Sequence, residues 1–297
     1  MSLLDAFRRR KIAFVLSGGG NLGATQVGML RALTERDIRP DLVLGASVGA
    51  LNGAAYAADP TLGGVRRLED LWLDLEDDDV MPGSWLPASL QLARRGESIH
   101  SNAGLRKVID NALTAATFEE LQVPFECVTT AVEPAEETWF HRGPLKEPIL
   151  ASAALPAVYP LVEIDGIRYM DGAVVNDVPV TRAVELGART IYILHVGTLD
   201  RPWLDPKRPF DVIVQAYWIA RRHRYKEDLA ALPRRVQAII LPVGSPPPLK
   251  YNDFTRSQEL ITQAYGATAA HLDAISGRKS ELPPPLPPLR VVGEDLD

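Results

Sequence analysis

Short apolar runs alternate with longer segments of helical periodicity along most of the chain. Residues 12–16 (IAFVL) form one such run, and Ser17-Gly18-Gly19-Gly20 follows it directly. A continuous apolar run of this length that ends in glycine predicts a buried parallel strand that leads into a glycine loop. Residues 22–35 carry apolar side chains at helical spacing, and residues 42–44 are apolar again. The chain therefore opens with a predicted strand–helix–strand unit, and such crossovers are right-handed.

The alternation of strands and helices continues through the rest of the sequence. Further strands are predicted at 125–132, 137–141, 162–164, 167–169, 190–196 and 236–241. Further helices are predicted at 65–75, 102–113, 148–155, 177–186, 210–232 and 254–272, with Pro179 in the first turn of its helix. Strands that alternate with helices predict an α/β fold whose sheet is covered on both faces.

Length and the distribution of proline predict the domain organisation. At 297 residues the chain has the size of one large α/β enzyme domain, and we assign residues 1–281 to a single domain. Residues 282–297 are proline-rich and acidic, which predicts an unfolded tail or a strap. Residues 61–122 are mostly helical in pattern, and three interpretations stay open: a cap over an active site, a surface that touches lipid, or ordinary helices packed on a face of the sheet.

Composition and charge exclude several classes of function. The formal net charge is −6, with 32 basic and 38 acidic residues, so we expect no nucleic-acid partner. Cys127 is the single cysteine, which excludes an internal disulfide and is typical of a reducing compartment. No apolar run reaches the roughly 20 residues that span a bilayer. The N-terminus places its charges after its apolar residues, unlike a secretory signal. We therefore expect a soluble, cytoplasmic protein.

Residues 42–58 (LVLGASVGALNGAAYAA) hold the strongest candidate for chemistry. The apolar run ends in Gly45-Ala46-Ser47-Val48-Gly49, and residues 50–58 are mostly small helix formers. A strand before and a helix after are the setting of a nucleophile elbow, G-x-S-x-G, in which a serine projects from a sharp turn. Gly45 and Gly49 have no side chains, which lets strand and helix approach closely. We interpret Ser47 as a candidate nucleophile; the alternative is a turn with a packing role alone.

The glycine loop at residues 18–23 (GGGNLG) has two interpretations. It contains G-x-G-x-x-G, but the second strand ends in the elbow rather than in the acid that a dinucleotide site places there. The Gly-Lys-Ser/Thr of a P-loop is also missing, so a nucleotide site is disfavoured. The stronger hypothesis is an oxyanion hole, in which the amides of Gly19, Gly20 and their neighbours point at the charge that develops on an attacked carbonyl oxygen.

A serine hydroxyl needs a base, and the sequence offers two kinds. His195 lies near the end of a predicted strand, where a catalytic group could lie. It is one of five histidines, the others being His100, His141, His223 and His271. Asp171 follows another predicted strand and precedes a glycine, so it is either an ordinary turn residue or a carboxylate in reach of the serine across the sheet.

Four motifs in register resemble those of the patatin-like phospholipases. They are Gly18-Gly19-Gly20-x-x-Gly23, Gly45-x-Ser47-x-Gly49, the run ASAALP at 151–156, and Asp171-Gly172-Ala173 with Asn176 and Val178-Pro179. Their order and spacing agree with the family, and the resemblance covers residues 12–196. It implies a three-layer α/β/α fold with a mainly parallel central sheet, related to the α/β hydrolases.

The resemblance also implies a chemistry and the residues that perform it. By position, Ser47 is the nucleophile and Asp171 its base, in a Ser-Asp dyad. The oxyanion hole then comes from Gly18, Gly19, Gly20 and Asn21, and the site is supported by Gly23 and Gly172. The implied activity is that of a serine lipid acyl hydrolase (phospholipase A, lysophospholipase or lipid esterase) that acts on a lipid or ester substrate without a metal or other cofactor. The family usually has Arg or Lys where this chain has Leu22.

Two alternatives stay open beside this hypothesis. A Ser-His-Asp esterase on a similar fold would use His195, and a non-catalytic lipid-binding relative is compatible with Leu22. A lipid hydrolase meets its substrate at an interface, so we also expect peripheral membrane contact. Two surfaces are candidates for it: Trp85 with Leu86, or the basic run Arg221, Arg222, His223, Arg224 and Lys226, whose alternative role is a solvated helix face. The sequence leaves the oligomeric state open.

Overall fold

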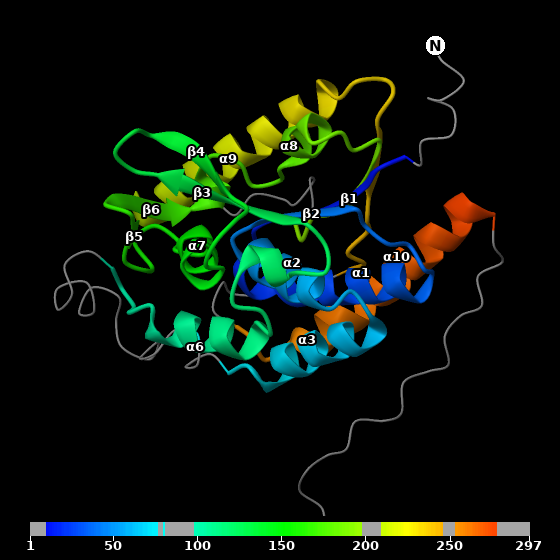
Figure 1. The fold of residues 1–297 in the computed structure, drawn as a ribbon, viewed down its shortest axis with the longest axis horizontal. Helices are drawn as coiled ribbons and strands as arrows, with labels where there is room; N and C mark the ends of the chain where they lie inside the picture. Colours follow the sequence, from blue (N-terminus) through cyan, green and yellow to red (C-terminus); the bar gives the residue numbers. More distant parts are fainter. Residues whose placement is uncertain (1–9, 77–79, 81–97, 198–208, 246–252, 278–297) are drawn as a thin grey trace, which may run out of the picture.

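A mostly parallel sheet of eight strands organises the chain (Figure 1). The computed structural model describes residues 10–76, 80, 98–197, 209–245 and 253–277. The strands are β1 (Ile12–Leu16), β2 (Leu42–Ala46), β3 (Phe125–Ala131), β4 (Glu136–Phe140), β5 (Val162–Ile164), β6 (Ile167–Asp171), β7 (Thr190–Leu194) and β8 (Gln237–Ile240). They follow the order β5-β6-β3-β2-β1-β7-β8, with β4 paired to β3. Strands β3, β2, β1, β7 and β8 are parallel, whereas β4 and β6 run antiparallel to β3.

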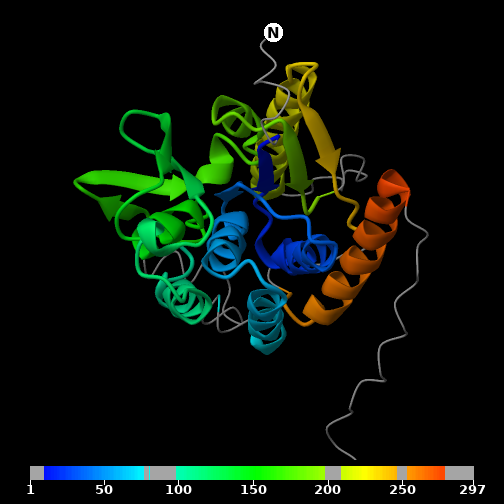
Figure 2. The same cartoon turned by 45° about the vertical axis from the view of Figure 1, so that its right-hand side comes forward.

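Helices cover both faces of this sheet. They are α1 (Ala24–Glu35), α2 (Val48–Ala58), α3 (Leu62–Asp74), α6 (Ala103–Ala112), α7 (Lys146–Ser152), α8 (Val180–Glu185), α9 (Pro209–Ala230) and α10 (Ser257–Ser276). Helices α1, α2, α3 and α10 lie on one side, and α8 and α9 lie on the other (Figure 1). Figure 2 shows α10, in orange, alongside α1, in blue. The predicted three-layer α/β/α fold with a mainly parallel sheet is confirmed.

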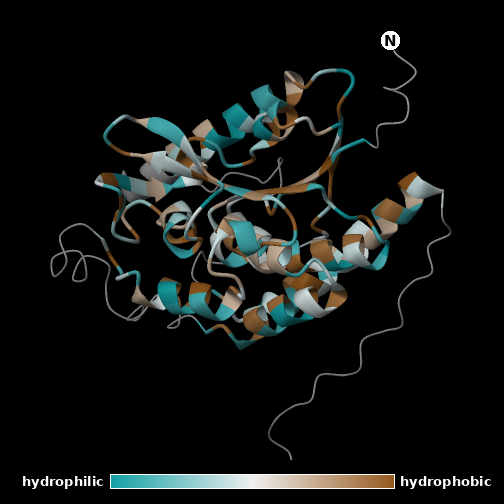
Figure 3. Cartoon of the chain, in the orientation of Figure 1, coloured by the Kyte–Doolittle hydropathy of each residue, from teal (hydrophilic) through white to brown (hydrophobic). Residues whose placement is uncertain are grey.

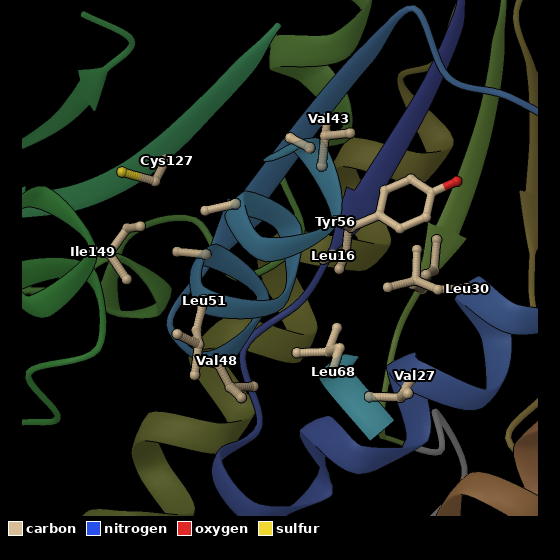
Figure 4. Close-up of a cluster of buried hydrophobic side chains, with 14 of the residues drawn as sticks. Leu16, Val27, Leu30, Val43, Val48, Leu51, Tyr56, Leu68, Cys127 and Ile149 are labelled. Carbon is tan, nitrogen blue, oxygen red and sulfur yellow. The ribbon is translucent and has the colours of Figure 1, made fainter. Parts of the chain in front are cut away.

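Alternating side chains of the central strands form a separate core on each face of the sheet. Phe14 and Leu16 of β1 belong to the larger cluster, on the side of α1 and α2, together with Val43 of β2. Figure 4 shows Leu16 and Val43 there, close to side chains of α1 and α2. Ala13 and Val15 belong to the second cluster, on the side of α8 and α9. Because both faces are covered, β1 and β2 are apolar throughout, and the middle of the sheet is coloured largely brown in Figure 3, which is why the sequence predicted these strands well.

Strand β3 brings the ends of two other strands together. β2 runs parallel to its first half, with Ala46 opposite Val128. β6 runs antiparallel to its second half, with Asp171 opposite Thr129, and β4 occupies the other edge along both halves. The carboxyl ends of β2 and β6 therefore meet head to head beside two consecutive residues of β3. Strand β1 lies next to β2 on the opposite side from β3, so the glycine loop that follows β1 emerges at this same edge.

Some predicted segments differ from the observed elements. The predicted helix 177–186 begins only at Val180, because the residues before it form the connection from the 3-10 turn η4 (Gly172–Val174), and Pro179 precedes the helix. Of the region 61–122, the described helices α3 and α6 pack against α1, α2 and α7 as an outer layer. The remainder of a cap there lies outside the described residues, as does the tail 282–297. The single domain 1–281 stays a prediction.

The packing of α1 on α10 depends on Gly28. A Cβ on Gly28 would lie 2.2 Å from the carbonyl oxygen of Ile261 and 2.8 Å from the amide nitrogen of Tyr265, both backbone atoms of α10. We predict that Gly28→Ala lowers the free energy of unfolding by about 2 kcal/mol, because the two helices must move apart. Urea unfolding followed by circular dichroism measures this change.

Gly266→Ala is the matched control, because it makes the same substitution within a helix where a Cβ would meet nothing within 4 Å. It should raise the free energy of unfolding by about 0.5–1 kcal/mol, since alanine favours a helix over glycine. Equal effects of the two substitutions would contradict the close approach of α1 and α10.

Candidate active site

Ser47 occupies the turn between β2 and α2 in a strained backbone conformation. Its φ is 54° and its ψ is −127°, a combination that a residue with a Cβ rarely adopts. The turn is tight enough to exclude side chains at both neighbouring glycines. A Cβ on Gly45 would lie 2.3 Å from the carbonyl oxygen of Gly49, and one on Gly49 would lie 2.4 Å from that of Leu16. The local geometry is that of a nucleophile elbow.

The hydroxyl of Ser47 donates a hydrogen bond of 2.6 Å to Oδ2 of Asp171. The carboxylate is 1% exposed, and its Oδ1 accepts a second hydrogen bond, of 2.8 Å, from the amide of Ala173. The backbone of Asp171 is held as well, because its amide donates to Ala154 and its carbonyl oxygen accepts from the hydroxyl of Thr130. The structure thus brings together the two residues that were predicted to form a dyad.

Burial raises the pKa of Asp171 from 3.8 to about 6, because the ionised carboxylate has lost its hydration. The hydrogen bonds from Ser47 and Ala173 and the positive charge of Arg221 oppose this rise in pKa, while the negative charge of Asp177 adds to it. A carboxylate with a pKa of about 6 is mostly ionised at neutral pH and accepts a proton more readily than a solvated aspartate does.

Ser152 holds the backbone of the elbow. It is fully buried at the end of α7, and its hydroxyl oxygen accepts a hydrogen bond of 3.0 Å from the amide of Ser47. Without this acceptor, an amide in the strained turn would be buried unpaired. The run ASAALP at 151–156 signalled the segment in the sequence, but the contact joins residues 105 positions apart and has no local pattern.

The glycine loop lies against the elbow. A Cβ on Gly18 would lie 3.0 Å from the Cβ of Ser47, so the absence of a side chain allows this approach. The amide of Gly18 donates to Oδ1 of Asp177 at 3.0 Å. The amides of Gly19 and Gly20 donate to no acceptor within the described part of the chain. Of the predicted oxyanion-hole residues, these two therefore have amides free to bind a ligand.

The other loop residues have structural contacts. The side chain of Asn21 donates to the carbonyl oxygen of Asp253 at 2.7 Å, which ties the loop to the segment before α10. Leu22 packs against the larger core cluster. A Cβ on Gly23 would lie 2.4 Å from Val48, and one on Gly172 would lie 2.1 Å from the carbonyl oxygen of Val128. Both glycines predicted to support the site therefore stand at close approaches.

A buried network of three side chains, which sequence analysis missed, clamps the ends of the glycine loop. Gln26 of α1 donates to the carbonyl oxygens of Ser17 and Leu194, at 2.8 and 3.1 Å. Asn52 of α2 donates to Gln26 and to the carbonyl oxygen of the last loop glycine, and Trp72 of α3 donates to Asn52. Each amide hydrogen of the network has an acceptor, so the network can be buried without a desolvation penalty for unpaired groups.

The printed sequence offered His195 as an alternative base, but its side chain contacts other residues than Ser47 among those described. Its Nδ1 is 2.7 Å from the carbonyl oxygen of Gly197, and its ring stacks on Tyr225 with 5.1 Å between the centroids. Burial lowers the pKa of His195. Among the described residues, the partner of the Ser47 hydroxyl is Asp171 rather than this histidine.

The basic run on α9 is not one solvated face. Arg221 is 8% exposed and forms an ion pair with Asp177, whose side chain is also buried. The other members of the run are exposed or half-buried. The interpretation of the run as a surface patch is therefore wrong for Arg221, which is buried against Asp177. Trp85 and Leu86, the other predicted membrane contact, lie outside the described residues.

The fold and this geometry together define an α/β protein with a serine held in a nucleophile elbow. The sequence profile described as "Patatin-like phospholipase" matches residues 14–184, which is more than half of the chain. The chain belongs to the patatin-like phospholipase family, and this membership supports the broad assignment as a lipid hydrolase.

Curated relatives match this chain over a small part of their own length. Patatin-like phospholipase domain-containing protein 7 of Rattus norvegicus is 31% identical over 191 residues, which cover 64% of this chain and 14% of the relative. Protein ZK370.4 of Caenorhabditis elegans is 29% identical over 283 residues, covering 88% and 20%. Lysophospholipase nte1 of Aspergillus terreus is 28% identical over 195 residues, covering 64% and 12%. Among solved structures, VipD from Legionella pneumophila has a TM-score of 0.49 at 15% identity, covering 89% of this chain and 67% of VipD.

The raised pKa of Asp171 predicts how stability depends on pH. The folded state binds the proton of this carboxyl more tightly than the unfolded state does, so the contribution of Asp171 to stability falls as pH rises from about 4 to about 6. Asp171→Asn removes this titration. We predict that the free energy of unfolding of the variant rises by about 2.5 kcal/mol relative to that of the unsubstituted protein between pH 4 and pH 7.5, as measured by urea unfolding at both values.

Asp37→Asn serves as the control, because Asp37 lies in an exposed turn. It reports the general effect of removing one carboxylate. A difference between Asp171→Asn and the unsubstituted protein that stays constant over this pH range would show that the Asp171 carboxyl has an ordinary pKa.

Proposed function

We propose that the chain is a serine lipid acyl hydrolase that uses Ser47 as nucleophile and Asp171 as base. The observation that carries this proposal is the 2.6 Å hydrogen bond between the two side chains, made by a serine held at φ 54° in the elbow. A structural serine needs neither the strained turn nor a buried carboxylate as partner, since an exposed or backbone-bonded hydroxyl is satisfied at lower cost.

The first half-reaction forms an acyl-enzyme. As Oγ of Ser47 attacks the ester carbonyl carbon, its proton passes to Oδ2 of Asp171, along the existing hydrogen bond. The oxyanion that develops on the substrate accepts hydrogen bonds from the amides of Gly19 and Gly20, which are free of other acceptors among the described residues. Collapse of the tetrahedral intermediate expels the alcohol, which takes the proton back from Asp171.

The second half-reaction releases the acid. The ionised Asp171 takes a proton from a water molecule that attacks the acyl carbon, the same amides hold the second oxyanion, and the proton returns to Ser47 as the free fatty acid leaves. No step requires a histidine. A carboxylate with a pKa near 6 can perform both proton transfers at neutral pH, because it is ionised before each attack.

The substrate in this proposal is a lipid ester, and the relatives suggest which one to test first. The name of the Aspergillus terreus relative is lysophospholipase. Lysophospholipids are therefore the first substrates to assay, followed by diacyl phospholipids and neutral glycerides. A lipid substrate places the enzyme at an interface, and peripheral membrane contact and a cytoplasmic location remain part of the proposal. In the part of the chain that the structure describes, no helix has the length and apolar character to cross a membrane.

The test compares the protein with Ser47→Ala and Asp171→Asn. We predict that a fluorophosphonate labels one residue per chain, that peptide mapping places the label on Ser47, and that both variants lose labelling. Hydrolysis of a short-chain ester should fall by about 10³-fold or more in Asp171→Asn, because the loss of a positioned base costs about 10²–10⁴-fold in rate.

Two further variants keep this test specific. Ser276→Ala removes an exposed serine at the end of α10 and should change neither labelling nor hydrolysis. His195→Asn can still donate to Gly197 and should keep most of the activity. Loss of activity in His195→Asn with activity retained in Asp171→Asn would replace the dyad by the Ser-His-Asp alternative.

A further inference from the structure

An ion pair lies buried beside the candidate dyad, and no step of the proposed reaction uses it. The guanidinium of Arg221, on α9, contacts Oδ1 of Asp177, in the connection before α8, and the two side chains are 6% and 7% exposed. The guanidinium also lies over the rings of Tyr217 and Trp218, at 5.0 and 4.7 Å from their centroids. Burying such a pair seldom adds to stability, so its position calls for another explanation.

Asp177 connects this ion pair to the glycine loop. The oxygen that faces Arg221 also accepts the hydrogen bond of 3.0 Å from the amide of Gly18. A Cβ placed on Gly18 would lie 2.8 Å from this oxygen and 3.0 Å from the Cβ of Ser47, so Asp177 and the serine flank the same point of the loop. Movement of Asp177 would therefore shift the loop residue directly before Gly19 and Gly20.

The side chains that act on the carboxyl of Asp171 lie on the elbow, on the connection before α8 and on α9. Ser47 and Asp177 face it from the elbow and from the connection before α8, and Arg221 and Tyr217 act on it from α9. His195, at the end of β7, is coupled to Asp177 and Arg221 rather than to Asp171. Arg221 lowers the pKa of Asp171 and Asp177 raises it, so the two members of the pair act in opposite directions.

We propose that the Arg221–Asp177 ion pair is a positioning device for the dyad: Asp177 fixes the start of the glycine loop, and Arg221 both holds Asp177 and balances its charge at the base. An uncompensated carboxylate at 177 would add a second buried negative charge that acts on Asp171. This inference rests on the proposed roles of Ser47 and Asp171. Both residues of the pair act through their neighbours and touch no reacting atom.

Substitutions of Arg221 and Asp177 should shift the pH–rate profile in opposite directions, whereas substitutions in a purely structural ion pair would not. We expect the acid limb of the pH–rate profile for ester hydrolysis to lie near pH 6, where Asp171 ionises. Arg221→Met removes the positive charge and should move this limb up by about one pH unit. Asp177→Asn keeps an acceptor for Gly18, removes the negative charge, and should move the limb down by about one unit.

Two more variants complete the set. Arg221→Lys keeps the charge and should restore the limb to near pH 6, even if the loss of the planar guanidinium lowers kcat. The double variant Arg221→Met with Asp177→Asn removes both charges and should also return close to the original limb. Should Arg221→Met fail to fold, the downward shift in the nearly isosteric Asp177→Asn still tests the proposal.

A carbon-13 NMR titration of the aspartate carboxyl groups separates this inference from the proposed function. Assigned with Asp171→Asn, it reports the ionisation of Asp171 in each variant whether or not the protein hydrolyses esters. Opposite shifts in Arg221→Met and Asp177→Asn support the ion pair as the positioning device. Shifts in the same direction, or none, overturn it. Absence of hydrolysis with opposite NMR shifts would leave the ion pair in place and refute the proposed reaction.

Discussion

The candidate site depends on the junction at which β2 and β6 meet end to end along β3. Ala46 and Asp171 stand opposite consecutive residues of β3, so the backbone ladder itself places the Ser47 hydroxyl within 2.6 Å of the carboxylate. Side chains on ladder-bonded strands move little relative to one another, whereas a base on a loop would require separate anchoring. The meeting is possible because β6 runs antiparallel to β3 whereas β2 runs parallel to it.

The junction stores unfavourable energy in two forms. Ser47 has a strained backbone, and Asp171 loses the hydration of its charge, which is the reason why its pKa rises to about 6. Both costs are offset by surrounding contacts that hold the groups in place: Ser152 pairs the amide of Ser47, and the amide of Ala173 pairs the second oxygen of Asp171. A base that is destabilised when ionised accepts a proton more readily, so the same burial that reduces stability favours the proposed chemistry.

The sequence predicted those parts of the molecule that have a local pattern. β1, the elbow and α2 follow from a continuous apolar run, two glycines and a run of small helix formers. The base did not follow from such a pattern: Asp171 is 124 residues from Ser47, and only the resemblance of four motifs singled it out over His195. Gln26, Ser152 and Asp177 were missed because their partners are distant in sequence. The burial of Arg221 was missed because it belongs to a run of basic residues, whose composition resembles a solvated face.

Leu22 and Arg221 together determine how much positive charge is available around the candidate site. At position 22 the family usually carries a cation, and here a leucine packs on the core instead. Among the described residues, the positive charge that acts on Asp171 is the guanidinium of Arg221. This guanidinium already forms an ion pair with Asp177, and both side chains are buried. Among the described residues around the dyad, this cation is therefore committed to holding the loop and is not available to a substrate head group. Such a charge balance places the recognition required by the proposed acyl transfer on the ester itself, through Ser47 and the amides of Gly19 and Gly20, rather than on an ion pair between Arg221 and a head group.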